Sequence, residues 1–433
     1  MPNGTPPGPG LPPEVGAALR RAFEGEWARI LATLIRVTGD WDVSEEAAAG
    51  AFERAAATWP RDGVPRTPGA WLTTTARNLA LDRLRRAGVE AGKVRDWLAD
   101  AEAEGRLSGP PDPADLVADA GEPLQDDRLR LVFTCAHPAL PMPSRVALTL
   151  RTVGGLETAE IARAFFVAEP AMAQRIVRAK RKIAHAGIPY RVPSPADLPE
   201  RLNGVLAVLY LIWNEGYLAS SGDRLQRLDL AGEAIRLTRL VAGLLPAEED
   251  VRSLLALMLL QHARADARTD ERGDLVALED QDRSAWQADE LAEGLALLET
   301  LPATPAPRSP YRIQAEIQGV HARAADAAAT DWPAIARWYD ELHTVSPSPF
   351  VELNRAIARG LAHGPERGLH DLRELERTGR LAGYHLLPAA LADLHRRAGE
   401  PGAAAAQYAR AIALAPTAPE RRYLERRLAA LVD

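Results

Sequence analysis

The chain has 433 residues, slightly more acidic than basic residues, a formal net charge of −7 and a single cysteine. A prior of roughly 150 residues per domain predicts two to four domains. One cysteine excludes an intramolecular disulfide and is typical of a reducing compartment; we expect Cys135 to be a buried apolar residue.

Membrane and secretory segments are not evident in the sequence. The longest apolar runs, at residues 205–213 and 254–260, are much shorter than the ~20 residues that a membrane span needs. The start of the chain lacks the basic and apolar segments of a signal peptide. Its Pro and Gly content predicts a disordered tail over residues 1–17, and we expect a cytoplasmic protein.

Helical periodicity dominates the sequence, and no series of alternating strands is evident, so we expect an all-α fold. Apolar residues from Trp27 to Ile35 form one helical stripe. A second helix is expected over residues 44–58, with Ser44 as its N-cap. After a Pro- and Gly-rich loop at residues 59–69, a third helix is predicted over residues 68–86, with Pro68 in its first turn.

An acidic block separates this helical unit from the next. Carboxylates recur through residues 96–127, where Arg106 is the only basic residue and GPPDP interrupts the pattern. Such a composition favours an extended linker over a packed core. We therefore predict a helical unit over residues 18–90, an acidic linker over residues 91–125 and a second unit over residues 126–190.

Residues 156–187, LETAEIARAFFVAEPAMAQRIVRAKRKIAHAG, predict a helix-turn-helix. We expect Thr158 to cap its first helix, a short connection at residues 167–169, and Glu169-Pro170 to open its second helix. No acid follows Glu169 until Asp197, and a basic helix after a tight turn is typical of one that enters the major groove. The alternative is a solvated basic face on an ordinary helix pair. The basic residues in this window are Arg175, Arg178, Lys180, Arg181, Lys182 and Arg191.

The helix over residues 68–86 is a second candidate for contact with nucleic acid. It combines an aromatic residue, small hydrogen-bonding groups and arginines that are opposed only by Asp82. Such a set is suited to holding unpaired bases, whereas the alternative for Trp71 and Leu72 is a place in the core. The candidate contacts are Trp71, Thr74, Arg77, Asn78, Arg83, Arg85 and Arg86.

Residues 198–433 are predicted to be helical, with repeats towards the C-terminus. The dipeptides Trp332-Pro333, Gly364-Pro365 and Glu400-Pro401 recur at similar spacings, and each separates two amphipathic helices. Around the last dipeptide, small, aromatic and proline residues follow the pattern of a tetratricopeptide repeat; generic antiparallel helix pairs are the alternative. These positions are Leu391, Ala392, Ala404, Tyr408, Ala411 and Pro416.

Two of these segments resemble extracytoplasmic-function sigma factors, a type of sigma-70 RNA polymerase sigma factor. PGAWLTTTARNLALDRLRRA is similar to the promoter-melting end of sigma region 2, and GGLETAEIARAFFVAEPAMAQRIVRAKRKI is similar to sigma region 4, which reads the −35 element. The resemblance covers about residues 18–190 and leaves no room for a region 3 domain. It implies promoter recognition and transcription initiation, with RNA polymerase core and promoter DNA as partners.

The resemblance also implies roles for individual residues. Family members usually carry a Gln-Glu pair that docks on the polymerase clamp. This chain has Ala49 and Gly50 at those positions. The departure predicts a reduced affinity for the clamp, or compensation by the C-terminal extension. Acids that remain for polymerase binding are Glu45, Glu46 and Glu53. Expected contacts to the −35 element are Ala171, Met172, Gln174, Arg175, Arg178, Arg181 and Lys182.

The rest of the chain resembles the C-terminal extension of one sigma subgroup with tetratricopeptide-like repeats. The segments that carry this similarity are WNEGY (213–217), LEDQDRSAW (278–286), ELNRAIA (352–358) and YHLLPAALADL (384–394). The resemblance implies an extension that tunes sigma activity, and a concave repeat surface suits a protein or peptide partner. For LEDQDRSAW we leave two interpretations open: a signal-sensing site or a buried, salt-bridged packing motif.

Motifs of catalysis and cofactor binding are missing from the sequence. It contains no His-Glu-x-x-His, no paired Cys ligands, no Walker loop and no Gly-x-Ser-x-Gly elbow. We therefore expect no enzymatic activity, no metal site and no cofactor. The alternative function is a polymerase-independent helix-turn-helix regulator with a ligand- or peptide-sensing repeat domain, and co-purification with core polymerase separates the two.

Overall fold

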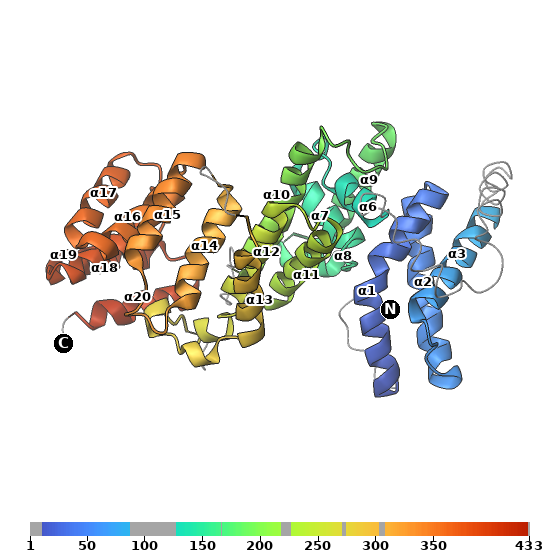
Figure 1. The fold of residues 1–433 in the computed structure, drawn as a ribbon, viewed down its shortest axis with the longest axis horizontal. Coiled ribbons are helices and arrows are strands. Elements are labelled where there is room, and N and C mark those ends of the chain that lie inside the picture. Colours follow the sequence, from blue (N-terminus) through green and yellow to red (C-terminus); the bar gives the residue numbers. More distant parts are fainter. Residues whose placement is uncertain are drawn as a thin grey trace. The chain divides into compact units, whose positions relative to one another are not determined.

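The computed structural model describes residues 11–86, 127–165, 167–217, 227–270, 274–302 and 308–431. Every element in these ranges is helical, apart from an isolated bridge between Thr269 and Leu275, so the predicted all-α fold is confirmed. The chain divides into two units, Met1–Leu211 and Ile212–Asp433, and the boundary falls inside helix α10 (Leu198–Tyr217) (Figure 1).

Three helices begin the first unit: α1 (Pro13–Thr38), α2 (Trp41–Asp62) and α3 (Pro68–Arg86). Each packs against the other two, and the rings of Phe23, Trp27 and Phe52 meet in the core with centroids 5.0–6.1 Å apart. Because α1 begins at Pro13, the predicted disordered tail over residues 1–17 is wrong for its last five residues. Residues 1–10 lie outside the described residues.

The bounds of α3 agree with the prediction, whereas those of α2 do not. Asp40 is the N-cap of α2, because its carboxylate accepts hydrogen bonds from the backbone N–H groups of Asp42 and Val43. Ser44, the predicted N-cap, lies inside the helix and donates its hydroxyl to the Asp40 carbonyl at 2.6 Å. Since α2 continues to Asp62, only residues 63–67 of the predicted loop lie between α2 and α3.

Four short helices follow in the first unit: α6 (Asp127–Cys135), α7 (Met142–Thr152), α8 (Thr158–Ala164) and α9 (Glu169–His185). Both α7 and α8 pack against α9. Cys135 is fully buried, as predicted, with its Sγ 3.0 Å from Thr152 Oγ1, and burial raises the pKa of its thiol to about 12. The predicted acidic linker, residues 91–125, lies outside the described residues.

Helix α12 (Glu249–His262) is central to the first half of the second unit. It packs against α11 (Leu228–Leu244), α13 (Ala288–Glu299) and α14 (Pro310–Arg323). Residues 253–260 of α12 are all buried, as expected for a helix with neighbours on several sides. Gly216 lets the end of α10 approach the start of α11, since a Cβ at this position would lie 2.4 Å from the backbone nitrogen of Ala231.

Six helices complete the second unit, coloured orange to red in Figure 1. Each packs against the next. The Trp332-Pro333, Gly364-Pro365 and Glu400-Pro401 dipeptides stand at the starts of three of them, as predicted, where proline needs no hydrogen-bond acceptor for its nitrogen. The six are α15 (Trp332–Val345), α16 (Pro349–His363), α17 (Pro365–Arg377), α18 (Leu386–Arg397), α19 (Pro401–Leu414) and α20 (Ala418–Ala429).

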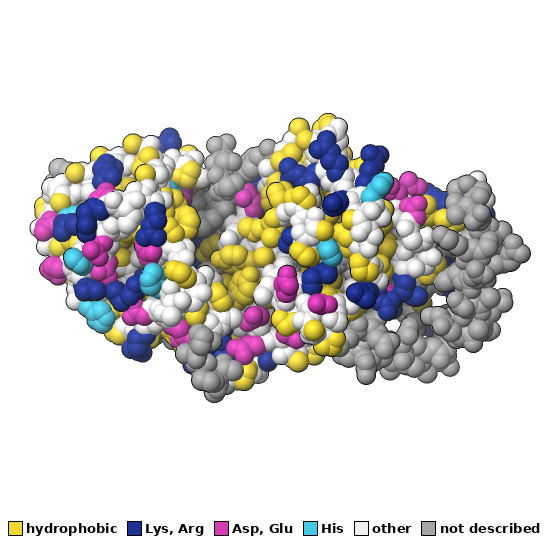
Figure 2. Space-filling view, turned by 90° about the horizontal axis from the view of Figure 1, so that it is seen from above, with side chains coloured by type: hydrophobic (Ala, Val, Ile, Leu, Met, Phe, Trp, Pro, Cys, Tyr) yellow, Lys and Arg dark blue, Asp and Glu magenta, His cyan; other side chains and the backbone are white. Residues whose placement is uncertain are grey.

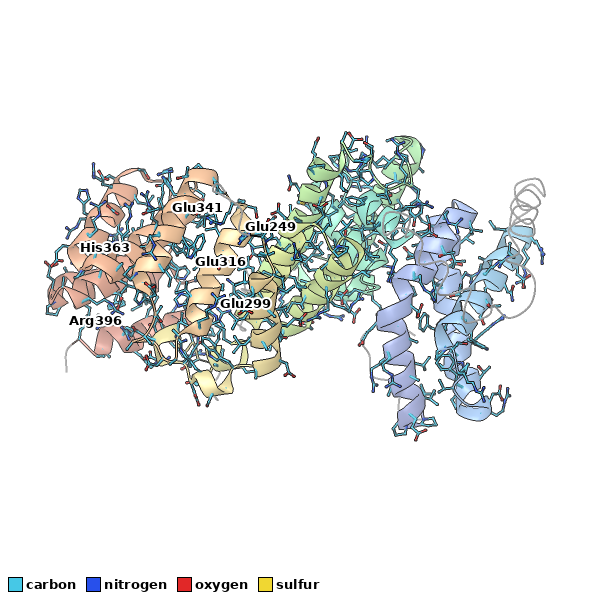
Figure 3. All side chains as sticks on the ribbon, in the orientation of Figure 1. Glu249, Glu299, Glu316, Glu341, His363 and Arg396 are labelled. Atoms are coloured by element: carbon cyan, nitrogen blue, oxygen red, sulfur yellow. The ribbon has the colours of Figure 1, made fainter. Side chains whose placement is uncertain are left out.

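Ion pairs stabilise the middle of the second unit. Buried Arg312, in α14, pairs with Glu249 of α12 at 2.7 Å and lies 3.7 Å from Glu316. Arg308, before α14, pairs with Glu341 of α15 at 3.0 Å. Figure 3 labels the three glutamates. Acidic and basic side chains are interspersed over the surface of the C-terminal helices (Figure 2).

The last helix, α20, binds the segment that precedes α13. Arg422 and Arg426 of α20 both pair with Asp274, and Arg427 lies 3.5 Å from Glu279. Glu279 also pairs with Arg397 of α18 at 2.7 Å. Glu279 of LEDQDRSAW is therefore salt-bridged to the C-terminal helices, although its side chain is exposed and not buried as the packing interpretation expects.

Candidate nucleic-acid interface

Helices α8 and α9 form the predicted helix-turn-helix. The backbone N–H of Glu157 donates to Glu160 Oε2 at 2.7 Å, so the N-cap of α8 is Glu157 and not Thr158 as predicted. Helix α8 ends at Ala164, and α9 opens at Glu169-Pro170 as expected. The short connection fixes α9 against α8, as a DNA-reading helix requires.

Helix α9 has one buried face and one exposed face. Buried residues recur every three or four positions and pack against α7 and α8: Met172, Ile176, Ala179 and Ile183. Met172 is 0% exposed, so the prediction that it contacts DNA was wrong. The other predicted contact residues of α9 lie on its solvent-facing side. Ala171, Gln174, Arg178, Arg181 and Lys182 are exposed, and Arg175 is partly exposed.

Lys180 is the one basic residue of α9 that binds the first three helices. Its ammonium nitrogen lies 2.8 Å from Asp42 Oδ1 and 2.9 Å from Glu45 Oε1, both on α2. Arg151 of α7 reaches the second oxygen of Glu45 at 3.3 Å. These ion pairs hold the back of α9 against α2 and leave its exposed face uninvolved.

Other polar contacts join the same two groups of helices. Trp27 Nε1 donates to the Thr152 carbonyl at 3.1 Å, and the Tyr190 hydroxyl donates to the Ala32 carbonyl at 3.0 Å. Local sequence gives no sign of this packing, because each contact joins residues more than 100 positions apart.

Helix α3 presents a polar face. Thr74, Asn78 and Arg85 are exposed and, with Asp82, recur at intervals of three or four residues, so they lie on one side of the helix. Arg86 is exposed beside them. The predicted base-stacking residue, Trp71, is half-buried, with its ring 5.7 Å from that of buried Trp59.

Two arginines of the predicted melting set lie closer to the core. Arg77 and Arg83 are both partly buried. The Nη1 of Arg83 lies 3.0 Å from Glu46 Oε2, so this arginine joins α3 to α2. The structure thus brings Thr74, Asn78, Arg85 and Arg86 together at the surface and gives Arg83 a packing role as well.

The three acids predicted to bind polymerase have different environments. Glu46 and Glu53 are exposed on α2. Glu45 is buried between Lys180 and Arg151, so in this structure it is not available to a partner, and that prediction is corrected. Gly50 lies close to α3. A Cβ at this position would lie 3.1 Å from Leu79 Cδ1, a tight contact.

The described residues form neither a metal site nor a membrane span. No group of three or more His, Cys, Asp or Glu side chains in the described ranges is arranged to hold a metal ion. None of the described helices is both long and apolar enough to cross a membrane.

Comparisons with known families decide the identity. Residues 26–89 match the model of sigma-70 region 2, and residues 130–183 match that of sigma-70, region 4. The chain belongs to the sigma-70 family of RNA polymerase sigma factors. As a sigma factor it is not an enzyme, and its partners are RNA polymerase core and promoter DNA. The region 2 match disfavours a polymerase-independent regulator. Residues 201–301 match a family of unknown function (DUF6596).

A full-length relative extends the similarity over both units of this sigma factor. It is the "Uncharacterized protein R00370" of Rhizobium meliloti (strain 1021), which is 42% identical over 398 residues, or 92% of each chain. The relationship therefore includes the C-terminal helices as well as regions 2 and 4. No solved structure matches the chain.

Proposed function

We propose that this sigma factor is of the extracytoplasmic-function type and recognises a two-element promoter. In this proposal α9 reads the −35 element and α3 holds one strand of the −10 element. The exposed basic face of α9 carries the proposal, because it places side chains for bases and phosphates on one side of a helix that follows a tight turn. The direct succession of regions 2 and 4 supports it.

Position along α9 separates the proposed base contacts from the phosphate contacts. Gln174 and Arg175 lie nearer the N-terminal end, which enters the major groove in helix-turn-helix proteins. A bidentate contact between Arg175 and a guanine would contribute about 1–3 kcal/mol of discrimination. Arg178, Arg181 and Lys182 lie farther along and would neutralise phosphates, which fixes the register without reading sequence.

The exposed face of α3 supplies groups for an unpaired strand. Thr74 and Asn78 offer hydrogen bonds, while Arg85 and Arg86 offer charge to the backbone. The exposed part of Trp71 is available for stacking on a base. Base flipping costs a few kcal/mol, and contacts of this kind offset that cost.

Promoter binding requires regions 2 and 4 to separate. The two elements are centred about 25 base pairs, or roughly 85 Å, apart in B-DNA, whereas Lys180 binds Asp42 and Glu45 directly. Residues 87–126 connect the regions and reach up to about 130 Å when extended, at roughly 3.3 Å per residue. We therefore propose that Lys180 releases Glu45 when the polymerase and promoter bind, and that Glu46 and Glu53 make the first polymerase contacts.

We further propose that the C-terminal helices form a tetratricopeptide-like regulatory extension and that the protein acts in the cytoplasm. Support comes from the positions of the repeat pattern, since Leu391, Ala392, Ala404, Tyr408 and Ala411 are all buried between consecutive helices. A repeat surface of this kind suits a protein or peptide partner. Changed promoter-specific transcription by a chain that ends at Leu211 would support a regulatory role, and unchanged transcription would remove it.

Run-off transcription with purified core polymerase tests the main proposal. The template is the DNA upstream of the chain's own coding sequence, and the control is the same template with its −35 segment scrambled. Transcripts from the intact template alone are the expected result. Absence of binding to core polymerase in a pull-down without DNA would contradict the proposal.

A further inference from the structure

Tyr217, the last residue of α10, is held by two arginines that follow α12. Arg264 Nη2 donates to the Tyr217 hydroxyl at 2.9 Å. Arg268 Nη1 donates to the Tyr217 carbonyl at 3.0 Å, and the Arg268 guanidinium lies 4.0 Å from the centre of the Tyr217 ring. Both positive charges therefore lie beside one buried phenol.

A third arginine and a histidine extend this basic group. Arg283, in the short helix η4 (Arg283–Ala285), donates its Nη1 to the carbonyls of His321 and Ala324, both at 2.6 Å. Burial, together with the charges of Arg264 and Arg283, lowers the pKa of His321 to about 4. Four basic side chains from three separate segments are thus close enough for their positive charges to interact unfavourably.

Two of the three arginines in this group, Arg264 and Arg283, make no ion pair in the part of the chain that the structure describes. Their hydrogen bonds go to a phenol and to backbone carbonyls. Burial lowers the pKa of Arg283, and Asp326 offsets this only from a distance. Both guanidinium groups are partly buried, and a cation removed from water without a counter-charge is costly, so the arrangement favours an anion.

Several buried nitrogen atoms here also have no hydrogen-bond partner in the described part of the chain. They are Arg264 Nε, Arg283 Nη2, His321 Nδ1 and Trp286 Nε1. His321 is 9% exposed and Trp286 is 6% exposed, so bulk water does not satisfy them. Unsatisfied buried polar groups are rare in native proteins, and an ion or water in the site is the usual explanation. Three of these four are N–H donors in every protonation state, which calls for an acceptor.

We propose that this basic group binds a small anion through its phosphate or carboxylate oxygens. The oxygens accept hydrogen bonds from Arg264 Nε, Arg283 Nη2 and Trp286 Nε1, and the negative charge neutralises the arginines. WNEGY supplies Tyr217, and LEDQDRSAW supplies Arg283 and Trp286, so two segments far apart in the sequence form one site. The proposal gives a binding activity to the C-terminal extension and does not depend on how promoter DNA is read.

Thermal unfolding and calorimetry of the full chain test the proposal with inorganic phosphate and with citrate, each against sodium chloride at equal ionic strength. We expect a saturable rise in Tm with at least one of the two anions, and the stronger response identifies phosphate or carboxylate as the ligand chemistry. The Arg264→Gln variant should bind that anion at least tenfold more weakly. Its matched control is Arg239→Gln, an exposed arginine of α11 that pairs with Glu293 and should bind normally.

A second measurement covers the case in which Arg264→Gln fails to fold. Burial by itself raises the pKa of Tyr217, but Arg264 and Arg268 outweigh it and hold this pKa below its ordinary value. A bound anion neutralises those charges and should raise the pKa of Tyr217. Subtracting the ultraviolet pH titration of Tyr217→Phe from that of the full chain isolates this tyrosine. No shift with saturating anion, or equal affinities of Arg264→Gln and Arg239→Gln, would overturn the proposal.

Discussion

The ammonium group of Lys180, in the DNA-reading helix α9, lies 2.9 Å from the carboxylate of Glu45 in region 2. Only 12% of the lysine side chain and 9% of the glutamate side chain are exposed. If regions 2 and 4 bind separate promoter elements as proposed, the pair stabilises one arrangement of the sigma factor and breaks in another.

Replacing Lys180 with Ala should destabilise the first unit. Glu45 would keep Arg151 as a partner, so we expect a loss of about 1–3 kcal/mol and not the larger cost of a fully unpaired buried charge. Urea unfolding of the full chain, followed by circular dichroism, measures the change. Lys182→Ala is the control, because Lys182 is exposed on the same helix. Equal stabilities of the two variants would show that the ion pair contributes nothing.

Replacing Arg178 with Ala should weaken binding to every promoter by a similar factor. Arg178 is exposed, hydrogen-bonded to Gln174 at 3.2 Å, and lies past the end of α9 that enters the groove. Loss of one phosphate contact should reduce the slope of log K against log salt by about 0.9. Binding of holoenzyme to several promoters over a salt series measures both effects. A change in sequence preference without a change in slope would instead make Arg178 a base contact.

Replacing Asn78 with Ala should impair promoter opening more than promoter binding. Its side chain is exposed on the face of α3 that we assign to the unpaired strand. Permanganate reactivity of unpaired thymines reports opening, while retention of duplex DNA by the holoenzyme reports binding. If binding fell and opening of the bound fraction did not, α3 would be a duplex-binding helix.

Replacing Leu391 with Ala should destabilise the C-terminal helices by about 2–5 kcal/mol, the usual cost of a large-to-small change in a core. Leu391 is 1% exposed in α18. Leu386, in the same helix, is 41% exposed, and its replacement with Ala should cost little. Denaturant unfolding of both variants makes the comparison. Similar losses would mean that α18 does not pack as described.

His321 should make stability depend on pH below neutrality. Its folded pKa of about 4 lies below the unfolded value of about 6.5, because burial and two arginines oppose its protonation. The effect of His321 on the free energy of unfolding is therefore absent above pH 6.5. As the pH drops towards 4, this residue lowers the free energy of unfolding by up to about 3 kcal/mol. Unfolding of the wild type and His321→Gln at pH 7.5 and pH 5 should show a smaller loss for the variant. Parallel losses would contradict this role of His321.

Features set by local sequence were predicted well. Pro68, Pro170, Pro333, Pro365 and Pro401 all lie in the first turn of a helix, because proline fixes one backbone angle and its missing N–H is not needed there. The buried face of α9 follows from apolar spacing alone. Both predicted N-caps, Ser44 and Thr158, were wrong, because Asp40 and Glu157, a few residues earlier, begin these helices.

Features set by distant parts of the chain could not be predicted. Glu45 has the sequence context of a surface acid, but it is buried by contacts with Lys180 and Arg151, each more than 100 positions away. Met172 lies where a base contact is expected, but its side chain faces the core. The basic group around Tyr217 comes from three segments that are individually unremarkable in charge, so nothing in the sequence indicates that their arginines meet.

The buried thiol of Cys135 makes region movements measurable in the intact protein. It is the sole cysteine of the chain, and a pKa of about 12 leaves almost no thiolate at neutral pH. Maleimide dyes will therefore attach only at cysteines introduced on the surface. One at Ala184 and one at Ala57, exposed residues of α9 and α2 to which no binding role is assigned, would form a pair whose energy transfer reports the separation of these helices, in single molecules and during polymerase binding.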